Sequence, residues 1–444
     1  MIVTPLLFAP LLYAPVDTRR LDTIVRAYAA NRQFSGSVLI ARKGKVVFDR
    51  AYGMANWDWK TPNTVSTKYR LGSVTKQFTA AAVLLLEERG KLRLEDSILK
   101  YFPSAPEAWR PIKVVHLLRH ESGIPDITGL PGYANFERLS HSKDELLLRF
   151  SNLPLLFEPG TKHRYSNSGY IVLGQLIEKV SGEPYESFLR KSIFDVARMA
   201  ETGSDSTTSV VPNRATGYVA TEDGFAPATY IDMSVPLGAG NLYSTTRDLL
   251  RWEIALFGGK VLRPDSFVKM KAPFRGVSSS ETGTGMGLAT DDTYGRRQIF
   301  FGGGIEGFNS WLAYDPADET VVVALSNVTT PWLEDMSGQL SAVCRGEKVV
   351  LTSERKEIRV EEATLRKYVG VYVISPTMNF NIGLESGRLY VQVDGQDRFK
   401  LYPEAENRFF LKDLDAQGEF VTNTKGSWDL LWHQGGTTLR APRK

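Results

Sequence analysis

The sequence predicts an α+β fold, in which an antiparallel sheet is flanked by helices and carries an inserted helical lobe. An all-β, barrel-like domain is expected after it. A strand–turn–strand pattern stands at residues 37–50, and strong strand patterns return only at residues 297–326, after a long helical middle. A sheet built from both ends of one domain fits that order. From about residue 356, short alternating runs separated by turn signals predict the all-β domain.

The 444 residues are enough for one large domain and a smaller one. We expect an apolar N-terminal segment over residues 1–17, a main domain over 18–350 and the β-domain over 356–444. The net charge of +4, with no basic run, argues against a nucleic-acid partner. A lone cysteine, Cys344, and five histidines without ligand spacing argue against a disulfide, a metal site and any cofactor.

The first fifteen residues are apolar, contain three prolines and carry no basic residue. They are too short for a membrane span. One interpretation is a signal peptide with a clipped or misassigned start, which predicts a periplasmic or secreted protein. The other is an N-terminal arm that lies on the body of the protein, which allows a cytoplasmic one.

Apolar periodicity and capping signals predict the elements of the main domain in order. Helices are expected at residues 18–32, 74–86, 112–119, 143–150, 170–180, 183–200, 247–257 (capped by Thr245 or Thr246) and 332–344. Strands are expected at residues 37–41, 46–50, 297–301, 310–314 and 320–326, with a glycine-rich turn after residue 301 and a loop-rich stretch over 201–235. In the β-domain, strands are expected at residues 368–374, 378–383, 389–393, 399–403 and 409–412.

The strongest chemical signal is the start of the helix at residues 74–86. That helix is apolar on all sides, which is typical of a buried helix. Ser73 stands at its N-terminus, where the unpaired N–H groups create a positive field. Lys76 follows three residues later, on the same face. A serine beside a desolvated amine on a rigid element is the arrangement that an activated nucleophile requires.

A structural interpretation of the same residues is a capping serine with a solvated lysine. Ser-x-x-Lys occurs five times in the chain, beginning at Ser73, Ser97, Ser140, Ser266 and Ser353, so the spacing alone decides little. Only the Ser73 copy is followed by a fully apolar helix. Burial is what would keep Lys76 neutral and able to act as a base. We therefore favour catalysis at Ser73.

Tyr165 and Asn167 form the second candidate group, in a loop that begins with Pro159-Gly160 and leads into the apolar helix at residues 170–180. A phenol near a buried lysine can exist partly as phenolate and transfer protons, and an amide side chain both donates and accepts. The alternative is a packed tyrosine whose hydroxyl is satisfied by the backbone. A similar Tyr-x-Asn at Tyr133 shows that the tripeptide is not distinctive by itself.

Five motifs stand in order: GSVTKQF, HLLRHESGIPD, PGTKHRYSNSGY, GAGNLYSTTRDLLRW and FGGGIEGFNSWLAYDP. Together they resemble the serine β-lactamase-like superfamily, in the branch of class C β-lactamases, D-alanyl-D-alanine carboxypeptidases, D-aminopeptidases and family VIII esterases. The resemblance covers about residues 18–345 and implies the β-lactamase/transpeptidase-like fold. It implies Ser73 as the acylated nucleophile, Lys76 as its partner, Tyr165 as the group that takes the serine proton and Asn167 as a substrate contact. The end of the chain resembles a lipocalin-like β-domain.

The third motif departs from the family. Relatives carry Lys-Thr-Gly or His-x-Gly on the strand that lines the cleft, whereas this chain has Phe301-Gly302-Gly303, followed by Gly304. We expect Phe301, Gly303 and Gly304 to contact the substrate, with the Gly304 N–H completing an oxyanion hole beside that of Ser73. The cation that binds a substrate carboxylate in relatives is missing. Arg297, which shares the strand parity of Phe301, is a partial substitute.

The leading hypothesis is a serine hydrolase that forms an acyl-enzyme on small neutral esters or amides. The first alternative is a D-amino-acid peptidase or a weak β-lactamase that uses the same residues. The second is a non-catalytic, penicillin-binding-like relative, against which the joint retention of Ser73, Lys76, Tyr165 and Asn167 argues. A Ser-His-Asp hydrolase is not favoured, because no G-x-S-x-G elbow is present and His163, the histidine nearest to Tyr165, is interpreted as structural.

Overall fold

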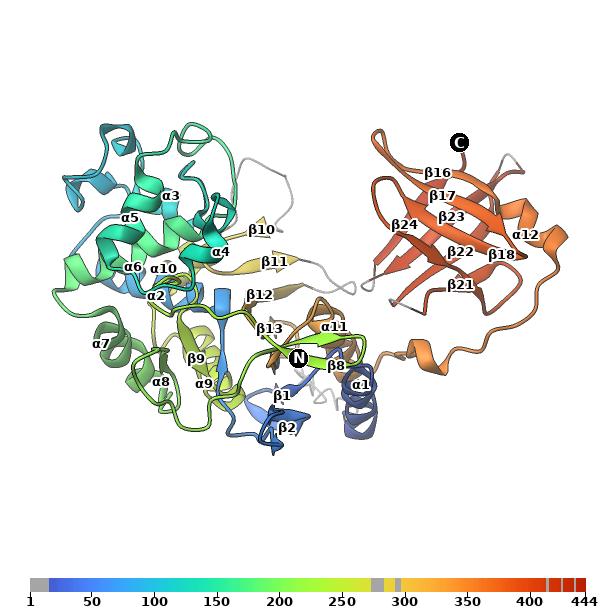
Figure 1. Ribbon diagram of the computed structural model, residues 1–444, viewed down its shortest axis with the longest axis horizontal. Coiled ribbons are helices and arrows are strands. Elements are labelled where there is room, and N and C mark those ends of the chain that lie inside the picture. Colours follow the sequence, from blue (N-terminus) through green and yellow to red (C-terminus); the bar gives the residue numbers. More distant parts are fainter. Residues whose placement is uncertain (1–15, 273–282, 292–296, 413–414, 425, 435–436) are drawn as a thin grey trace, which may run out of the picture.

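The computed structural model describes residues 16–272, 283–291, 297–412, 415–424, 426–434 and 437–444. Two groups of elements are joined by a long connecting segment (Figure 1). We call residues 16–344 the main part and residues 362–444 the C-terminal part. Within the described residues, no helix is long and apolar enough to cross a membrane. The apolar segment of residues 1–15 lies outside the described residues.

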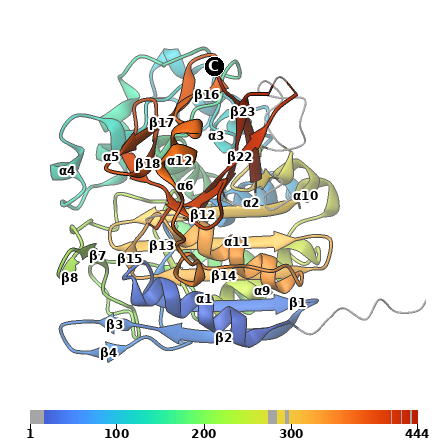
Figure 2. The same cartoon turned by 90° about the vertical axis from the view of Figure 1, so that its right-hand side faces the viewer.

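The main part is built around a seven-stranded antiparallel sheet with the spatial order β10-β11-β12-β13-β14-β1-β2. Strand β1 pairs with β14 along its whole length, so the first strands of the chain complete a sheet formed mostly by later ones (Figure 2). The strands are β1 (Gly36–Arg42), β2 (Lys45–Tyr52), β10 (Gly283–Thr284), β11 (Ala289–Asp291), β12 (Gln298–Ile305), β13 (Phe308–Asp315) and β14 (Thr320–Ser326). This order confirms the predicted sheet.

Both faces of the sheet are covered, because alternate residues of its central strands enter two different cores. Ile40 and Val322 belong to a core shared with the first and last helices of the main part, whereas Leu39 and Val323 belong to the larger core on the other face. Helices α1 (Thr18–Ala30) and α11 (Leu333–Cys344) cover the face of the first core. Helices α2 (Thr75–Glu88), α9 (Thr246–Phe257) and α10 (Pro264–Lys271) contribute to the larger core on the other face.

A helical lobe is inserted between β2 and β12, as predicted. Its long helix α6 packs against α2, α3 and α5, and residues 168–177 of α6 are therefore buried on all sides. The lobe helices are α3 (Val114–Leu118), α4 (Tyr133–Phe136), α5 (Lys143–Ser151), α6 (Asn167–Ser181), α7 (Tyr185–Leu189) and α8 (Asp195–Ala197).

Three small sheets complete the main part, and they modify the prediction that residues 201–235 are loop-rich. Strands β6, β7 and β8 fall in that stretch; they were missed because each has only two to four residues. The small sheets consist of β3 (Met54–Asn56) and β4 (Thr61–Pro62); β5 (Tyr69–Arg70), β9 (Leu242–Ser244) and β6 (Gly203–Ser204); and β15 (Val328–Thr329), β7 (Tyr218–Thr221) and β8 (Gly224–Pro227).

The glycine-rich turn that was expected directly after residue 301 does not lie there. Gly302, Gly303 and Gly304 lie inside β12 and pair with residues of β13, and the chain reverses two residues later, at Glu306 and Gly307. Glycines without side chains let the strand approach a neighbouring element closely. That neighbour is the turn that carries Ser73.

The C-terminal part is an all-β unit with its own core, as predicted. A four-stranded and a five-stranded sheet enclose the core, and a bridge between Tyr372 and Arg443 links the first strand to the end of the last. Its elements are α12 (Glu362–Tyr368), β16 (Gly370–Ser375), β17 (Met378–Glu385), β18 (Arg388–Val393), β19 (Arg398–Lys400), β20 (Tyr402–Pro403), β21 (Arg408–Phe410), β22 (Ala416–Thr422), β23 (Trp428–Gln434) and β24 (Thr437–Pro442). Helix α12 and the last three strands were not predicted.

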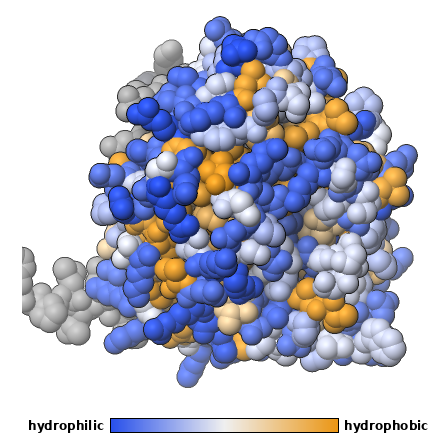
Figure 3. All heavy atoms as spheres, turned by 90° about the vertical axis from the view of Figure 1, so that its left-hand side faces the viewer, coloured by the Kyte–Doolittle hydropathy of each residue, from blue (hydrophilic) through white to orange (hydrophobic). Residues whose placement is uncertain are grey.

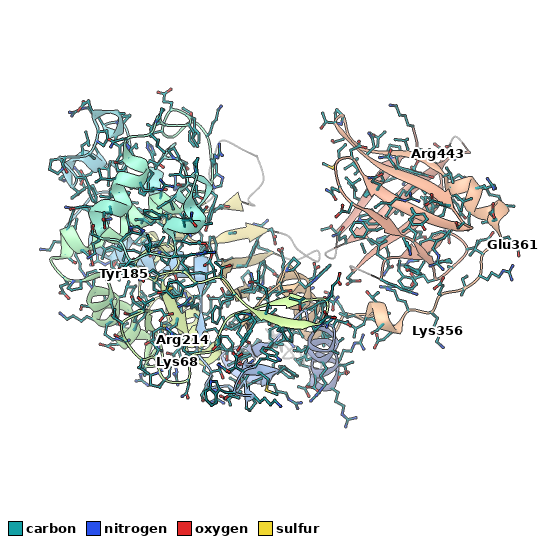
Figure 4. The ribbon with its side chains drawn as sticks, viewed as in Figure 1. Lys68, Tyr185, Arg214, Lys356, Glu361 and Arg443 are labelled. Atoms are coloured by element: carbon teal, nitrogen blue, oxygen red, sulfur yellow. The ribbon has the colours of Figure 1, made fainter. Side chains whose placement is uncertain are left out.

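Polar contacts tie the C-terminal part and the connecting segment to the main part. Gln339 of α11 donates to Asp415 Oδ2 at 2.6 Å, and Arg20 of α1 forms an ion pair with Glu354. Lys356 and Glu361 lie along the connecting segment, and Arg443 lies at the far edge of the β-unit (Figure 4). The opposite end of the molecule is largely hydrophilic, with scattered apolar patches (Figure 3).

Candidate active site

Ser73 lies in a short 3-10 turn, η1 (Gly72–Val74), that runs directly into helix α2. No side chain caps this helix start, and Ser73 lies in the positive field at the N-terminal end of the helix dipole. The turn is held from two sides. Leu71 N–H donates to Leu242 O at 2.8 Å, and Ser310 Oγ of β13 donates to Leu71 O at 2.6 Å.

Lys76 is completely buried, as predicted, and its amine meets three oxygen atoms. Lys76 Nζ donates to Asn167 Oδ1 and to Ala239 O, both at 2.8 Å, and lies 3.0 Å from Ser73 Oγ. A carbonyl oxygen can only accept a hydrogen bond, so these two contacts use two of the amine hydrogens. The third direction, towards Ser73, holds a proton in the ammonium form and the lone pair in the neutral amine.

Tyr165 completes the contacts of the serine. Its hydroxyl lies 2.6 Å from Ser73 Oγ, and the Lys76 amine lies 4.8 Å from the centre of its ring. The ring as a whole is 38% exposed. Ser73 Oγ therefore has one hydrogen-bond partner from α2 and one from the loop before α6, as the sequence predicts.

The pKa shifts of the two partners run in opposite directions. Burial lowers the pKa of Lys76 to about 7, although the negative charge of Asp126 opposes this. Neighbouring protein atoms that displace water raise the pKa of Tyr165 above its ordinary value, and the hydrogen bond with Ser73 offsets only part of the rise. Near neutral pH a neutral amine and a protonated phenol thus coexist. The raised pKa of Tyr165 favours the protonated phenol over the expected phenolate.

Asn167 is oriented by Asp126, a residue that the sequence analysis did not single out. Asp126 Oδ1 accepts the Asn167 backbone N–H at 2.8 Å, and its Oδ2 accepts Asn167 Nδ2 at 3.3 Å. A carboxylate only accepts, so the amide nitrogen of Asn167 must face it and Oδ1 must face Lys76. Asp126 closes the HESGIPD motif, but only the tertiary fold brings it to the start of α6.

His120 is a second residue that sequence reasoning missed. Its ring stacks on Tyr165 at 4.5 Å, and the ring of His163 lies beside His120, with ring centres 5.9 Å apart. His120 Nδ1 accepts the Ser166 N–H at 3.1 Å, and burial holds its pKa well below the ordinary value. His120 is therefore a neutral ring that supports the face of Tyr165, and it makes no contact that would form a Ser-His pair.

Strand β12 closes the site beside the serine, through its glycines. A Cβ at Gly303 would lie 2.1 Å from Leu71 O and 3.0 Å from Ser73 N, and one at Gly72 would lie 2.6 Å from Gly304 O. Only glycine fits at this contact. The strand and the serine turn thus touch through their backbones, as predicted.

A cleft of about 330 Å³ opens in front of the serine. It lies between the lobe and strand β12, and it is lined by Gly72, Ser73, Ile127, Thr128, Tyr133, Tyr165, Asn167, Ile171, Ile231, Val235, Pro236, Ala239, Gly240, Gly304, Ile305 and Glu306. Phe301 is not among these residues and is only 7% exposed. Of the predicted site residues, Ser73, Tyr165, Asn167 and Gly304 line the cleft. Lys76 and Gly303 do not line it but contact the serine turn from behind. Phe301 lies further back along the strand, so its expected contact with the substrate is wrong, and that of Gly303 is replaced by packing against the turn.

Other Ser-x-x-Lys copies follow the structural interpretation. Ser97 Oγ donates to Arg110 O and Lys100 forms an ion pair with Asp96, while Lys269 pairs with Glu87 on the surface. Among the hydrogen bonds of the described residues, the Ser-x-x-Lys copy at Ser73 is the one in which the serine and the lysine contact each other.

Comparisons with known proteins agree with this geometry. A family model described as Beta-lactamase matches residues 21–340, and one described as a domain of unknown function (DUF3471) matches residues 354–433. Penicillin-binding protein 4* of Bacillus subtilis (strain 168) is 28% identical over 96% of this chain and 98% of its own length. The D-amino acid amidase of Ochrobactrum anthropi SV3, solved with D-phenylalanine, is 25% identical with a TM-score of 0.64, over 74% of this chain and 97% of that one. The octameric penicillin-binding protein homologue from Pyrococcus abyssi has a TM-score of 0.68 and 24% identity, over 96% of this chain and 99% of that one.

Proposed function

The chain belongs to the beta-lactamase family and is a serine hydrolase, and from this premise we propose that Ser73 is its nucleophile and forms an acyl-enzyme. The observation that carries the proposal is the position of Ser73 Oγ, within hydrogen-bond distance of both Lys76 Nζ and Tyr165 Oη at the wall of the cleft. A nucleophile beside a desolvated amine on a rigid helix is what covalent catalysis requires.

Lys76 is the group that takes the serine proton. In its neutral form its two N–H groups are held by Asn167 Oδ1 and Ala239 O, so the lone pair is directed at Ser73 Oγ. Tyr165 then donates its hydroxyl hydrogen towards Ser73 or the leaving group. This assignment differs from the role that the resemblance implies for Tyr165, because the raised pKa of Tyr165 favours the protonated phenol as a proton donor.

Acylation breaks the ester or amide bond of the substrate and forms a bond between its carbonyl carbon and Ser73 Oγ. The serine proton passes to Lys76 and on to the leaving alcohol or amine. Backbone N–H groups of Ser73 and Gly304, at the contact between the serine turn and β12, stabilise the oxyanion. Water then attacks the acyl carbon while Lys76 accepts its proton. The bond to Ser73 Oγ breaks, Lys76 returns that proton to Oγ, and the acid is released.

Small esters or amides are the substrates that the cleft supports best. Its volume of about 330 Å³ and its largely apolar lining suit a small acyl compound. A D-amino-acid amidase or peptidase is the second candidate, supported by the likeness to the D-amino acid amidase. A catalytically impaired, penicillin-binding-like protein is disfavoured, because Ser73, Lys76, Tyr165 and Asn167 keep mutual contacts that binding alone would not need.

Export to the periplasm or the medium remains a prediction from the apolar residues 1–15. Cell fractionation tests this prediction, which expects the protein in the periplasmic fraction or in the medium.

Trapping of the acyl-enzyme tests the proposed function. Incubation with a fluorophosphonate ester should add one phosphonyl group to the intact protein, and peptide mapping should place it on Ser73. The matched control is Ser97→Ala, which alters another Ser-x-x-Lys copy and should leave labelling unchanged. A label elsewhere, or a label retained by Ser73→Ala, would refute Ser73 as the nucleophile.

A further inference from the structure

Glu306 gives the cleft a charge that the proposed chemistry does not use. It lies in the turn that follows β12, two residues after Gly304, and lines the same cleft as Ser73. Among the described residues that line the cleft, it is the one with a charged side chain; no lysine or arginine is among them. A substrate seated at Ser73 therefore meets a carboxylate and no cation along the cleft wall.

The Glu306 carboxylate lacks a partner among the residues that the structure describes. Its Oε2 atom is buried from solvent and accepts no hydrogen bond from them. A buried charge without a partner is costly, and proteins keep one mainly where a ligand supplies the partner. Other atoms of the Glu306 side chain line the cleft, so a cationic partner is expected to reach this carboxylate from the cleft.

Neighbouring groups add to the negative charge at this end of the cleft. Burial, followed by the charge of Glu306, raises the pKa of Glu137. Burial, followed by the charges of Glu306, Glu137 and Asp126, raises the pKa of Tyr133, which also lines the cleft. Arg138 offsets part of this effect at Glu137. A cation bound beside Glu306 would lower the repulsion among these carboxylates.

We propose that Glu306 is a specificity-determining residue that binds a protonated amine on the substrate, and this inference rests on the proposed function. An ammonium group carries three donors and a full charge, which match an acceptor-only carboxylate in a partly desolvated site. The enzyme selects amine-bearing esters or amides over those bearing a carboxylate.

Two pairs of esters, matched in shape, test the proposal at neutral pH. Methyl 4-(aminomethyl)benzoate and methyl 4-ethylbenzoate place an ammonium or a methyl group in the acyl part. The acetates of 4-(aminomethyl)benzyl alcohol and 4-ethylbenzyl alcohol place the same groups in the leaving alcohol. The wild type is expected to show a higher kcat/KM for the amine in at least one pair. Glu306→Gln, which keeps the shape but removes the charge, should abolish a preference of about 10- to 100-fold.

The two ethyl compounds are the reference substrates. Their kcat/KM in Glu306→Gln measures any general effect of the substitution on folding or on the cleft, and the amine preference is the ratio within each pair. Glu361→Gln, an exposed carboxylate at the start of α12 (Figure 4), is the matched charge control and should keep the full preference. An amine preference that is absent from both pairs, or that survives in Glu306→Gln, would overturn the inference. In that case hydrolysis of the ethyl esters that depends on Ser73 would leave the proposed function intact, whereas no hydrolysis of any ester by the wild type would overturn both.

Discussion

The buried amine of Lys76 is central to the proposed chemistry at the residue scale. Burial and hydrogen bonding act on it in different ways: burial lowers its pKa to about 7, and the two carbonyl acceptors fix the direction of its lone pair. A base with a pKa near the working pH combines a large neutral fraction with useful basicity. Ala239 O accepts a hydrogen bond from this amine, and the charge of Asp126 raises its pKa. His120 stacks on the ring of Tyr165. None of the three contacts Ser73 in the described structure.

We expect the pH profile of kcat/KM to report Lys76. Since the neutral amine is the reactive form, the rate should rise with pH through about 7 and then level off. Protonation below that pH should lower the rate about tenfold per pH unit. The profile should stay flat until Tyr165 loses its proton, above its ordinary pKa near 10.

Lys76→Arg is the matched variant, because a guanidinium stays charged. It should lower kcat/KM by at least about 10³-fold across the profile. A Lys76→Arg enzyme that kept its rate and its acid limb would contradict the assignment of Lys76 as the base.

Asp126→Asn should reveal a positioning residue. The variant loses the acceptor that holds Asn167 Nδ2, so we expect kcat to fall by about 10²-fold. The charge of Asp126 raises the pKa of Lys76, so its removal should also move the acid limb to lower pH. A merely structural role would lower the rate without this movement. Steady-state kinetics from pH 5 to 9 distinguish the two results.

The residues that carry chemistry were predictable where local sequence fixes their geometry. Ser73 and Lys76 are one helical turn apart, and Tyr165 and Asn167 stand next to the start of a buried helix, so pattern and resemblance found all four. Asp126 and His120 come from a distant loop, and only tertiary packing brings them to the site. The sequence shows that Lys76 is buried, but the direction of the pKa shift at Tyr165, which favours the protonated phenol, depends on the surrounding atoms.

Strand β12 determines the site at the element scale. Its glycines let the backbone of the strand lie against the serine turn, and the same strand then delivers Glu306 to the cleft. The hydrophobic pattern predicted the strand but ended it at residue 301, since glycine is usually a signal for a turn. The pairing of residues 302–305 with β13 overrides that local preference.

Gly303→Ala should disrupt this contact. The new Cβ would lie 2.1 Å from Leu71 O, a backbone atom that cannot move without displacing Ser73. We expect a loss of about 1–3 kcal/mol in the free energy of unfolding and about 10²-fold or more in ester hydrolysis. Gly304→Ala is the control for stability, because its Cβ would meet only the end of the Asn309 side chain, at 3.3 Å. Equal unfolding free energies for the two variants would show that the strand and the turn are not in contact.

The whole molecule consists of a hydrolase part and a β-unit with separate cores. The core of the C-terminal part contains only residues from 365 onwards, while the main sheet and its helices form the other two cores. The order of elements predicted this division. It missed β22, β23 and β24, because their long alternating strands lie between polar turns that do not resemble the earlier ones.

Phe420→Ala should separate the stability of the two parts. Phe420 is fully buried and stacks on Tyr368 at 4.3 Å. Its truncation should lower the free energy of unfolding of the C-terminal part by about 3–5 kcal/mol. Calorimetry should then show one unfolding transition at a lower temperature, while ester hydrolysis persists. Leu439→Ala, at a side chain that is 40% exposed, should change neither. Parallel loss of activity and of the C-terminal transition in Phe420→Ala would contradict two independent cores.

The central claim is that Ser73 attacks the substrate. Its most direct test is hydrolysis of a short-chain p-nitrophenyl ester by the wild type and by Ser73→Ala, measured side by side. We expect a clear rate from the wild type and a loss of about 10⁴- to 10⁶-fold in the variant, as for other nucleophiles that act together with their base. A variant that hydrolyses the ester at the wild-type rate would contradict the acyl-enzyme at Ser73.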